Sequence, residues 1–364
     1  MANTKSEYIK AVACASITAI TLTSCSGNGH APGPDPGPDP DPVVVELVVD
    51  FSDYVSGSLS YVQRFSEGYM VPSASELSQF DALSTSLVNQ ELETAGDTAG
   101  YINFELLKVI DTGANNNELY CLREIALRGQ GFYCVDFDAV TTNHISAPHP
   151  LYDRNTNTES VVVMRGTHAK FLSVSTTHRC SNAATSSCSG TTSACGASGP
   201  YKVSDPAHNV DTFFHRFGVG VHGGSATART IQLHGCGATA CPSNGDNGDI
   251  VARLSAGTTD NLPDTEFVNV LNTELNEELT PLQMGSSLSC SEPSADKQLC
   301  GTTNVLGRYI NGQADSCQNA ASSFNNSRWL HIEQNSNIRQ DDGAGDEVTP
   351  ATLLNAINDA FDTP

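Results

Sequence analysis

Basic residues are scarce in this chain, and their scarcity excludes one class of partner. The 364 residues include 18 Lys and Arg against 41 Asp and Glu, which gives a formal net charge of −23 at pH 7. Nucleic acids require a basic surface that neutralises their phosphates, so we expect no nucleic-acid partner. An acidic surface of this kind is usually a solubility feature, and it does not identify a substrate.

The N-terminal apolar run is too short to span a membrane as a permanent helix. This run, "AVACASITAITL", follows Lys5 and Lys10 and ends in "LTSC", which resembles the lipobox of bacterial lipoproteins. We therefore predict that residues 1–24 are a signal peptide and that Cys25 is lipidated, with palmitate among its acyl groups. An ordinary secretory signal is the alternative. In both cases the mature protein is exported, either to the bacterial cell envelope on a lipid anchor, with the outer membrane expected, or as a secreted protein.

Residues 25–42 lack the composition of a folded segment. The stretch "GNGHAPGPDPGPDPDP" is dominated by Pro, Gly and Asp. Because proline fixes φ and has no N–H donor, this stretch cannot form a helix or a β-ladder. It is typical of an extended spacer between a membrane anchor and a folded domain, and an ordinary flexible tail is the alternative. We expect one domain, residues 43–364.

No Cys-x-x-Cys spacing occurs among the cysteines, which makes a structural zinc cage unexpected. After the signal and the lipobox, ten cysteines remain, and an even number in an exported chain predicts disulfide bonds. Cys121 and Cys134 lie in two similar strand-like runs and are predicted to pair across a hairpin. Cys236 and Cys241 are predicted to close a small loop. The other six cysteines lie in two loops, Cys180, Cys188 and Cys195 in the first and Cys290, Cys300 and Cys317 in the second. Pairing within each loop alone would leave one cysteine of each loop without a partner.

Strand-like and helix-like patterns alternate along the second half of the chain. Three consecutive strand-like runs, "YINFELLKVI", "ELYCLREIAL" and "FYCVDFDAV", first predict a β-meander. The alternation that follows predicts an α/β fold with a mostly parallel or mixed sheet and helices on both faces. The predicted strands are "TTNHISAPH", "KFLSVSTTH", "RTIQLHG", "DIVARLSAG" and "RWLHIEQ", and the predicted helices are 73–95, 157–170, 206–217, 264–279 and 349–362.

Polar side chains gather where these predicted strands end. His149 and Asp153 follow the first, His178 and Arg179 end the second, His234 ends the third, and Glu333 ends the last, two residues after His331. Ligands of open α/β sheets bind beyond the carboxyl ends of the strands. We therefore expect these side chains to meet at one site.

Four short motifs in this order resemble the zinc carboxypeptidases and their relatives, the N-formylglutamate amidohydrolases and phage poly-γ-glutamate hydrolases. They are "HPLYDRNTNTE", "TTHRCSN", "LHGCG" and "LHIEQNSNIR", within about residues 135–340. The resemblance implies zinc held by His149, Asp153 and His234, with Glu333 as the catalytic base and Arg179 as the second catalytic group. It also implies substrate contacts from Arg154 and His178.

One spacing departs from the pattern of that family. The carboxypeptidase acid stands three positions after its histidine, whereas Asp153 stands four after His149, so Glu159 is kept as the alternative acidic ligand. In "SDPAHN", Ser204 or Asp205 suits a helix N-cap and Pro206 the first turn, which leaves His208 as a minor ligand candidate.

Two functional hypotheses remain open at this stage. The first is an exported zinc-dependent hydrolase that cuts an amide or ester bond in a small-molecule or peptide substrate. The second is a ligand-binding lipoprotein that keeps the fold without catalysis. A serine hydrolase is disfavoured because the chain has no Gly-x-Ser-x-Gly elbow.

Overall fold

The computed structural model describes residues 44–242, 248–293, 295–319, 327–339 and 348–362. The chain divides into two units, Met1–Asp41 and Pro42–Pro364, and all described residues belong to the second. The predicted signal peptide and Cys25 lie outside the described residues. Within the described part of the chain, no helix is both long and apolar enough to cross a membrane.

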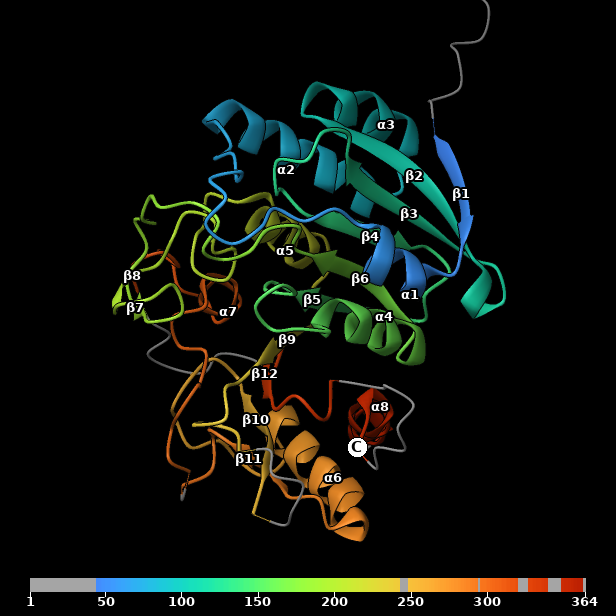
Figure 1. Cartoon of the computed structure of the whole chain (residues 1–364). Helices are drawn as coiled ribbons and strands as arrows, with labels where there is room; N and C mark the ends of the chain where they lie inside the picture. The colour runs from blue at the N-terminus through green and yellow to red at the C-terminus, as the bar shows by residue number, and fades with distance from the viewer. Residues whose placement is uncertain (1–43, 243–247, 294, 320–326, 340–347, 363–364) are drawn as a thin grey trace, which may run out of the picture. The chain divides into compact units, whose positions relative to one another are not determined.

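A ten-stranded mixed sheet forms the centre of the second unit, which confirms the predicted α/β fold (Figure 1). Its strand order is β1-β2-β3-β4-β6-β5-β9-β12-β10-β11. The strands are β1 (Val45–Val49), β2 (Phe104–Asp111), β3 (Asn117–Glu124), β4 (Phe132–Asp136), β5 (Thr141–Ala147), β6 (Ala169–Val174), β9 (Thr230–Gly235), β10 (Ile250–Ser255), β11 (Ser286–Ser289) and β12 (Trp329–Gln334). A separate two-stranded sheet joins β7 (Thr191–Thr192) to β8 (Gly199–Pro200).

Helices cover both faces of the sheet because most strands bury side chains on both sides. In β4, Phe132 and Cys134 join one apolar cluster, whereas Tyr133 and Val135 join another, as the alternation of a strand requires. Helices α1, α4, α6 and α8 contribute to the first cluster, and α2, α3 and α5 to the second (Figure 1). The helical segments are α1 (Phe51–Asp53), η1 (Tyr54–Ser58), α2 (Ala74–Val88), α3 (Leu92–Tyr101), η2 (Thr112–Ala114), α4 (Thr156–Gly166), α5 (Phe213–Gly224), α6 (Phe267–Leu282), α7 (Val305–Ile310) and α8 (Pro350–Asp362).

The four central strands β6, β5, β9 and β12 are mutually parallel. β5 pairs in parallel with both β6 and β9, and β9 pairs in parallel with β12. Their carboxyl ends therefore meet at one edge of the sheet. Antiparallel pairs flank this block, with β4 beside β6 and β10 beside β12, and β2, β3 and β4 form the predicted meander.

Two predicted helices differ from the structure. The helix expected at 73–95 is divided into α2 and α3, because the chain leaves the helical conformation at residues 89–91. The helix expected at 206–217 begins only at Phe213, where the Thr212 side chain caps it by accepting a hydrogen bond from the His215 N–H at 3.1 Å. Neither Ser204 nor Asp205 is an N-cap, because both side chains are engaged elsewhere, and Asp205 binds two histidines and an arginine. The sequence pattern could not reveal these distant partners.

Five disulfide bonds tie the described loops together, and they indicate an oxidising compartment outside the cytoplasm. The predicted pairs Cys121–Cys134 and Cys236–Cys241 are confirmed. The cysteines left over in the two loops join each other as Cys188–Cys317. The remaining pairs are Cys180–Cys195 and Cys290–Cys300.

We predict that the mature protein contains no free thiol among these ten cysteines, which mass spectrometry of unreduced, alkylated protein would check. Removing Cys188–Cys317 by a double Ser substitution should destabilise the fold more than removing Cys236–Cys241. The two bonds close sequence separations of 129 and 5 residues, and loop entropy alone predicts a difference of roughly 3 kcal/mol. Equal losses in the free energy of unfolding would contradict this account.

Candidate metal centre and its cavity

Three predicted ligands converge where the central strands end. His149, Asp153 and His234 each offer one ligand atom, and these atoms lie within 4.8 Å of one another. Asp153 Oδ2 lies 3.4 Å from His149 Nδ1 and 3.3 Å from His234 Nδ1. All three side chains are buried. The group can therefore hold a metal ion.

A tight turn after β5 brings Asp153 back to His149. The carbonyl oxygen of His149 accepts hydrogen bonds from the N–H groups of Tyr152 and Asp153 at 2.8 and 2.7 Å. Asn155 then adopts a left-handed backbone with φ of +72° and begins α4. This turn lets an acid four residues after its histidine reach the same point, although the shorter spacing is the one typical of the family.

Hydrogen bonds on the far side of each imidazole set its tautomer. His149 Nε2 lies 2.9 Å from Asp205 Oδ1, and His234 Nε2 lies 2.8 Å from Gln232 Oε1. Both partners are acceptors in this network, so each ring presents a proton on Nε2 to its partner and, in the neutral form, a lone pair on Nδ1. His149 Nδ1 accordingly has no hydrogen-bond partner despite its closeness to Asp153. Lone pairs of two nitrogens and a carboxylate oxygen thus face one another, as they do around a cation.

The charge states of these groups suit metal binding. Burial opposes ionisation of Asp153, but the closeness of the His149 and His234 imidazoles, which favour the ionised carboxylate when they carry a proton on the facing nitrogen, outweighs it and holds the pKa of this carboxyl well below its ordinary value. Burial lowers the pKa of His234 to about 4. At neutral pH the site therefore presents a carboxylate and a neutral imidazole, the forms that bind metals.

Asp205 connects the metal ligands to two further polar groups. Its Oδ1 lies 3.0 Å from His208 Nδ1, and its Oδ2 accepts hydrogen bonds from Arg179 Nε and Nη2 at 3.0 and 2.6 Å. Burial alone would raise the pKa of Asp205, but the charge of Arg179 and the hydrogen bond with His149 hold it well below the ordinary value. The ionised carboxylate fixes His149 from behind and holds the Arg179 side chain in place.

Glu333 and His331 approach the centre from β12. Glu333 is the register partner of His234 on the neighbouring strand β9, and its Oε1 lies 3.5 Å from His331 Nε2. Burial raises the pKa of Glu333 well above its ordinary value, and the negative charge of Asp153 adds to the rise. The His331 ring lies 4.4 Å from the His234 ring, and burial holds its pKa well below the ordinary value. Glu333 therefore lies beside the candidate metal ligands as an acid that burial keeps in its protonated form.

A cavity of about 340 Å³ opens onto this cluster. Its charged and imidazole side chains are Arg179, Glu333 and Lys297 with His149, His208, His234 and His331. Its other lining residues are Thr191, Thr192, Tyr201, Thr259, Leu299, Cys300, Gly301, Thr302, Thr303 and Asn304. Gly301 has φ of +64°, and a Cβ there would lie 3.0 Å from the His331 ring, so glycine permits this close approach.

Three residues considered from the sequence lie away from the cavity lining. Arg154 is exposed, and its carbonyl oxygen accepts a hydrogen bond from Arg339. His178 accepts a hydrogen bond from the Cys180 N–H at 3.0 Å and packs against Tyr152, and burial lowers its pKa to about 4.

Glu159, the alternative ligand, lies on the first turn of α4. Its Oε2 accepts a hydrogen bond from Gln334 at 3.0 Å, and burial raises its pKa to about 8. Asp153, and not Glu159, is therefore the acid that lies beside the two histidines.

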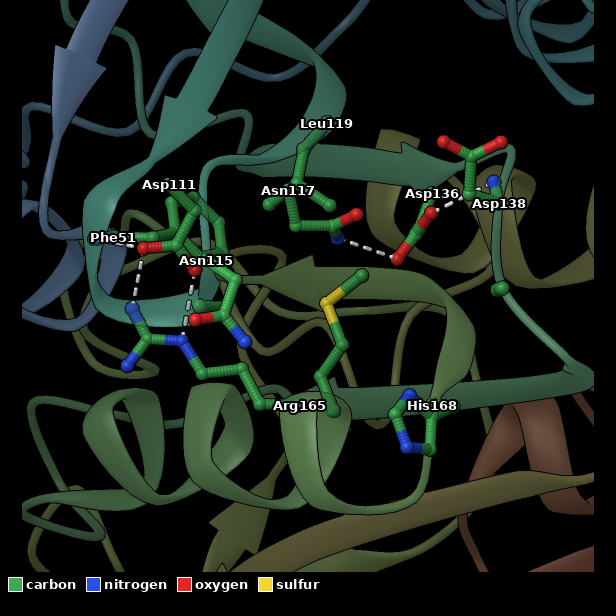
Figure 2. A pocket seen from close by; sticks show the side chains of 12 residues that line it. Phe51, Asp111, Asn115, Asn117, Leu119, Asp136, Asp138, Arg165 and His168 are labelled. Atoms are coloured by element: carbon green, nitrogen blue, oxygen red, sulfur yellow. Dashed lines mark hydrogen bonds and ion pairs between the residues drawn. The ribbon is translucent and has the colours of Figure 1, made fainter.

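A second cavity, of about 320 Å³, lies at the opposite edge of the central strands (Figure 2). It adjoins His168, which precedes β6, and three acidic residues line it: Asp111, Asp136 and Asp138. Asp111 accepts hydrogen bonds from Arg165 Nε and Nη2 at 2.8 and 2.6 Å, and Asp136 accepts one from Asn117 at 2.7 Å. These partners account structurally for Asp111 and Asp136.

We predict that purified protein binds one metal ion and that His149→Ala and His234→Ala lose it. Asp205→Asn should retain metal with an affinity lowered about 10–100-fold, the usual effect of changing an outer partner of a ligand histidine. His168→Ala, at the opposite edge of the sheet, is the control. Metal analysis and titration would decide, and stoichiometric metal in folded forms of both Ala variants would disprove the site.

We also predict that Glu159→Gln stabilises the metal-free protein increasingly as pH rises. The folded-state pKa of about 8 lies above the ordinary value, so folding favours the protonated acid. The wild type therefore loses free energy of unfolding as pH rises from about 4.5 to about 8. The Glu159→Gln variant has no titrating group at this position and loses none from it. Between pH 5 and 8 the gain in unfolding free energy should grow by on the order of 3 kcal/mol. Urea unfolding with chelator would measure it, with exposed Glu93→Gln as the control, and a pH-independent difference would refute it.

Comparison of the chain with protein-family models, curated proteins and solved structures finds no match. The resemblance to zinc carboxypeptidases therefore stays a hypothesis. Support for a function of this chain comes from its own residues and their geometry.

Proposed function

We propose that this protein is an exported zinc-dependent hydrolase of an amide or ester bond. The observation that carries the proposal is the convergence of two buried imidazoles and the Asp153 carboxylate beside a cavity that both imidazoles and Glu333 line. Zinc is chosen because His₂-carboxylate sets are typical of catalytic zinc. Ligand atoms that share a tetrahedral zinc lie roughly 3.3–3.6 Å apart. The separations of 3.4 and 3.3 Å from Asp153 Oδ2 fit that range.

The residues around the centre have complementary roles in this proposal. Bound zinc supplies Lewis-acid polarisation of a carbonyl and makes water more acidic. Glu333 would accept the proton of the attacking water and pass it to the leaving group, a role that its position in the cavity beside His234 and His331 allows. Arg179 keeps its Nη1 group free of partners in the described chain, while Asp205 holds Nε and Nη2. Nη1 would donate to the oxygen on which negative charge develops.

We further propose that the protein is anchored to the bacterial envelope through a lipid on Cys25. The lipobox-like "LTSC" and the spacer that follows it support this proposal, as does the disulfide framework, which requires an oxidising compartment. The outer membrane is the expected location.

A ligand-binding lipoprotein without catalysis is the competing function. One observation supports this competing function: His331, Glu333 and His234 lie close together and could also hold a metal ion. In that arrangement Glu333 would be a ligand and would not be available as a base. The effect of Glu333 on metal affinity separates the two functions.

We predict that Glu333→Gln keeps the fold and bound zinc but lowers kcat by about 10²–10⁴-fold, because glutamine cannot take the proton. The substrate would come from screening N-acyl amino acids, peptides and simple esters. Glu277→Gln, exposed on α6, controls for the loss of a carboxylate. Unchanged turnover would remove Glu333 from the mechanism, and loss of zinc would favour the binding protein.

A further inference from the structure

The cavity lining is rich in uncharged hydroxyl groups. Thr191, Thr259 and Thr302 line it, and none of their hydroxyls has a hydrogen-bond partner among the described residues. The Tyr201 hydroxyl lies 2.8 Å from Thr303 Oγ1, so this pair is already engaged but keeps further capacity to accept. Among the described lining residues, Leu299 is the one large aliphatic side chain. Such a wall suits groups that donate and accept hydrogen bonds.

The basic side chains of the lining have few donors left for a carboxylate. Lys297 Nζ donates to Asn261 Oδ1, Cys290 O and Glu292 O at 3.0, 2.6 and 2.9 Å, which uses all three of its hydrogens. Arg179 is paired with Asp205, and its one free nitrogen already has a role at the scissile carbonyl. A second anionic group would therefore meet no unengaged cation among the described lining residues.

The wider electrostatic field also disfavours an anionic substrate. The chain has a formal net charge of −23, and Asp153 and Asp205 lie next to His149, which lines the cavity. A buried carboxylate without an ion-pair partner is costly, whereas a carboxamide of the same shape can bind hydroxyl groups.

We infer that this site takes an uncharged, hydrogen-bonding peptide segment and does not select a free C-terminal carboxylate. The scissile amide would be an internal one, with the next peptide group lying against the hydroxyls of Thr191, Thr259 and Thr302. This inference rests on the proposed function because it places the scissile carbonyl at the metal centre. It goes beyond the function by excluding the exopeptidase mode of substrate recognition.

The test compares two ligands of nearly identical shape. Succinic acid monohydroxamate and its carboxamide share a zinc-binding hydroxamate and differ only in the far group, carboxylate or carboxamide. Calorimetric titration of the zinc-loaded full-length protein gives Kd for each. We expect the carboxamide to bind at least about tenfold more tightly, because the carboxylate lacks a cation partner.

Variants of Thr302 test whether the threonine hydroxyls of the cavity create the preference for the carboxamide. Thr302→Val keeps the shape of the side chain but removes the hydroxyl, and should weaken carboxamide binding about 3–10-fold with zinc content unchanged. Thr302→Ser should restore the affinity. Unchanged carboxamide affinity in the Val variants at 191, 259 and 302 alike would overturn the inference.

The outcomes separate this inference from the function on which it rests. Equal affinities, or tighter binding of the carboxylate, by a protein that holds zinc would overturn the inference and leave the hydrolase proposal intact. Retention of zinc without binding of either hydroxamate would likewise overturn it. Protein that holds no zinc would contradict both proposals.

Discussion

The parallel alignment of four central strands is the constraint on which the candidate site depends. β6, β5, β9 and β12 run in the same direction, so the residues at their carboxyl ends lie at one edge although they come from distant parts of the chain. A one-residue slip of β12 against β9 would turn Glu333 to the opposite face. The apolar side chains on both faces of these strands fix that register. The packing of the core therefore also determines the geometry of the candidate site.

Asp205 holds the buried polar side chains at this edge of the sheet in position. A single buried carboxylate accepts from Arg179 through Oδ2 and faces His149 and His208 through Oδ1. An isolated buried charge would be unfavourable, but here each oxygen has partners, one of them permanently cationic. The arrangement couples the orientation of a metal ligand to the position of a substrate-facing arginine. Disturbing either residue would therefore affect both.

The sequence predicted the α/β class, the meander and the strand ends near His149, His234 and Glu333, because these follow from hydrophobic periodicity. Arg179, predicted at a strand end, lies in the loop beyond β6, which already ends at Val174. It could not choose between Asp153 and Glu159, since that choice depends on the left-handed turn at Asn155. Asp205 was predicted as a helix cap because its partners are 56 and 26 residues away.

The cavity wall was also beyond prediction from the sequence. Thr259 and Thr302 belong to loops without periodicity, Thr191 lies in the two-residue strand β7, and disulfide bonds hold the segments around Thr191 and Thr302. Cys188–Cys317 was left open because loop cysteines can pair within or between loops, and spacing alone does not distinguish these possibilities.

Three of the disulfide bonds belong to the wall of the cavity itself. Cys180 directly follows Arg179, Cys188–Cys317 anchors the loop with Thr191, and Cys300 is itself a lining residue. A newly made chain in a reducing compartment would lack these links, and the loops that line the cavity would not be held against the candidate metal ligands. Formation of the cavity is thus tied to an oxidising compartment, so under the proposed function the chain would acquire its activity only where these bonds form.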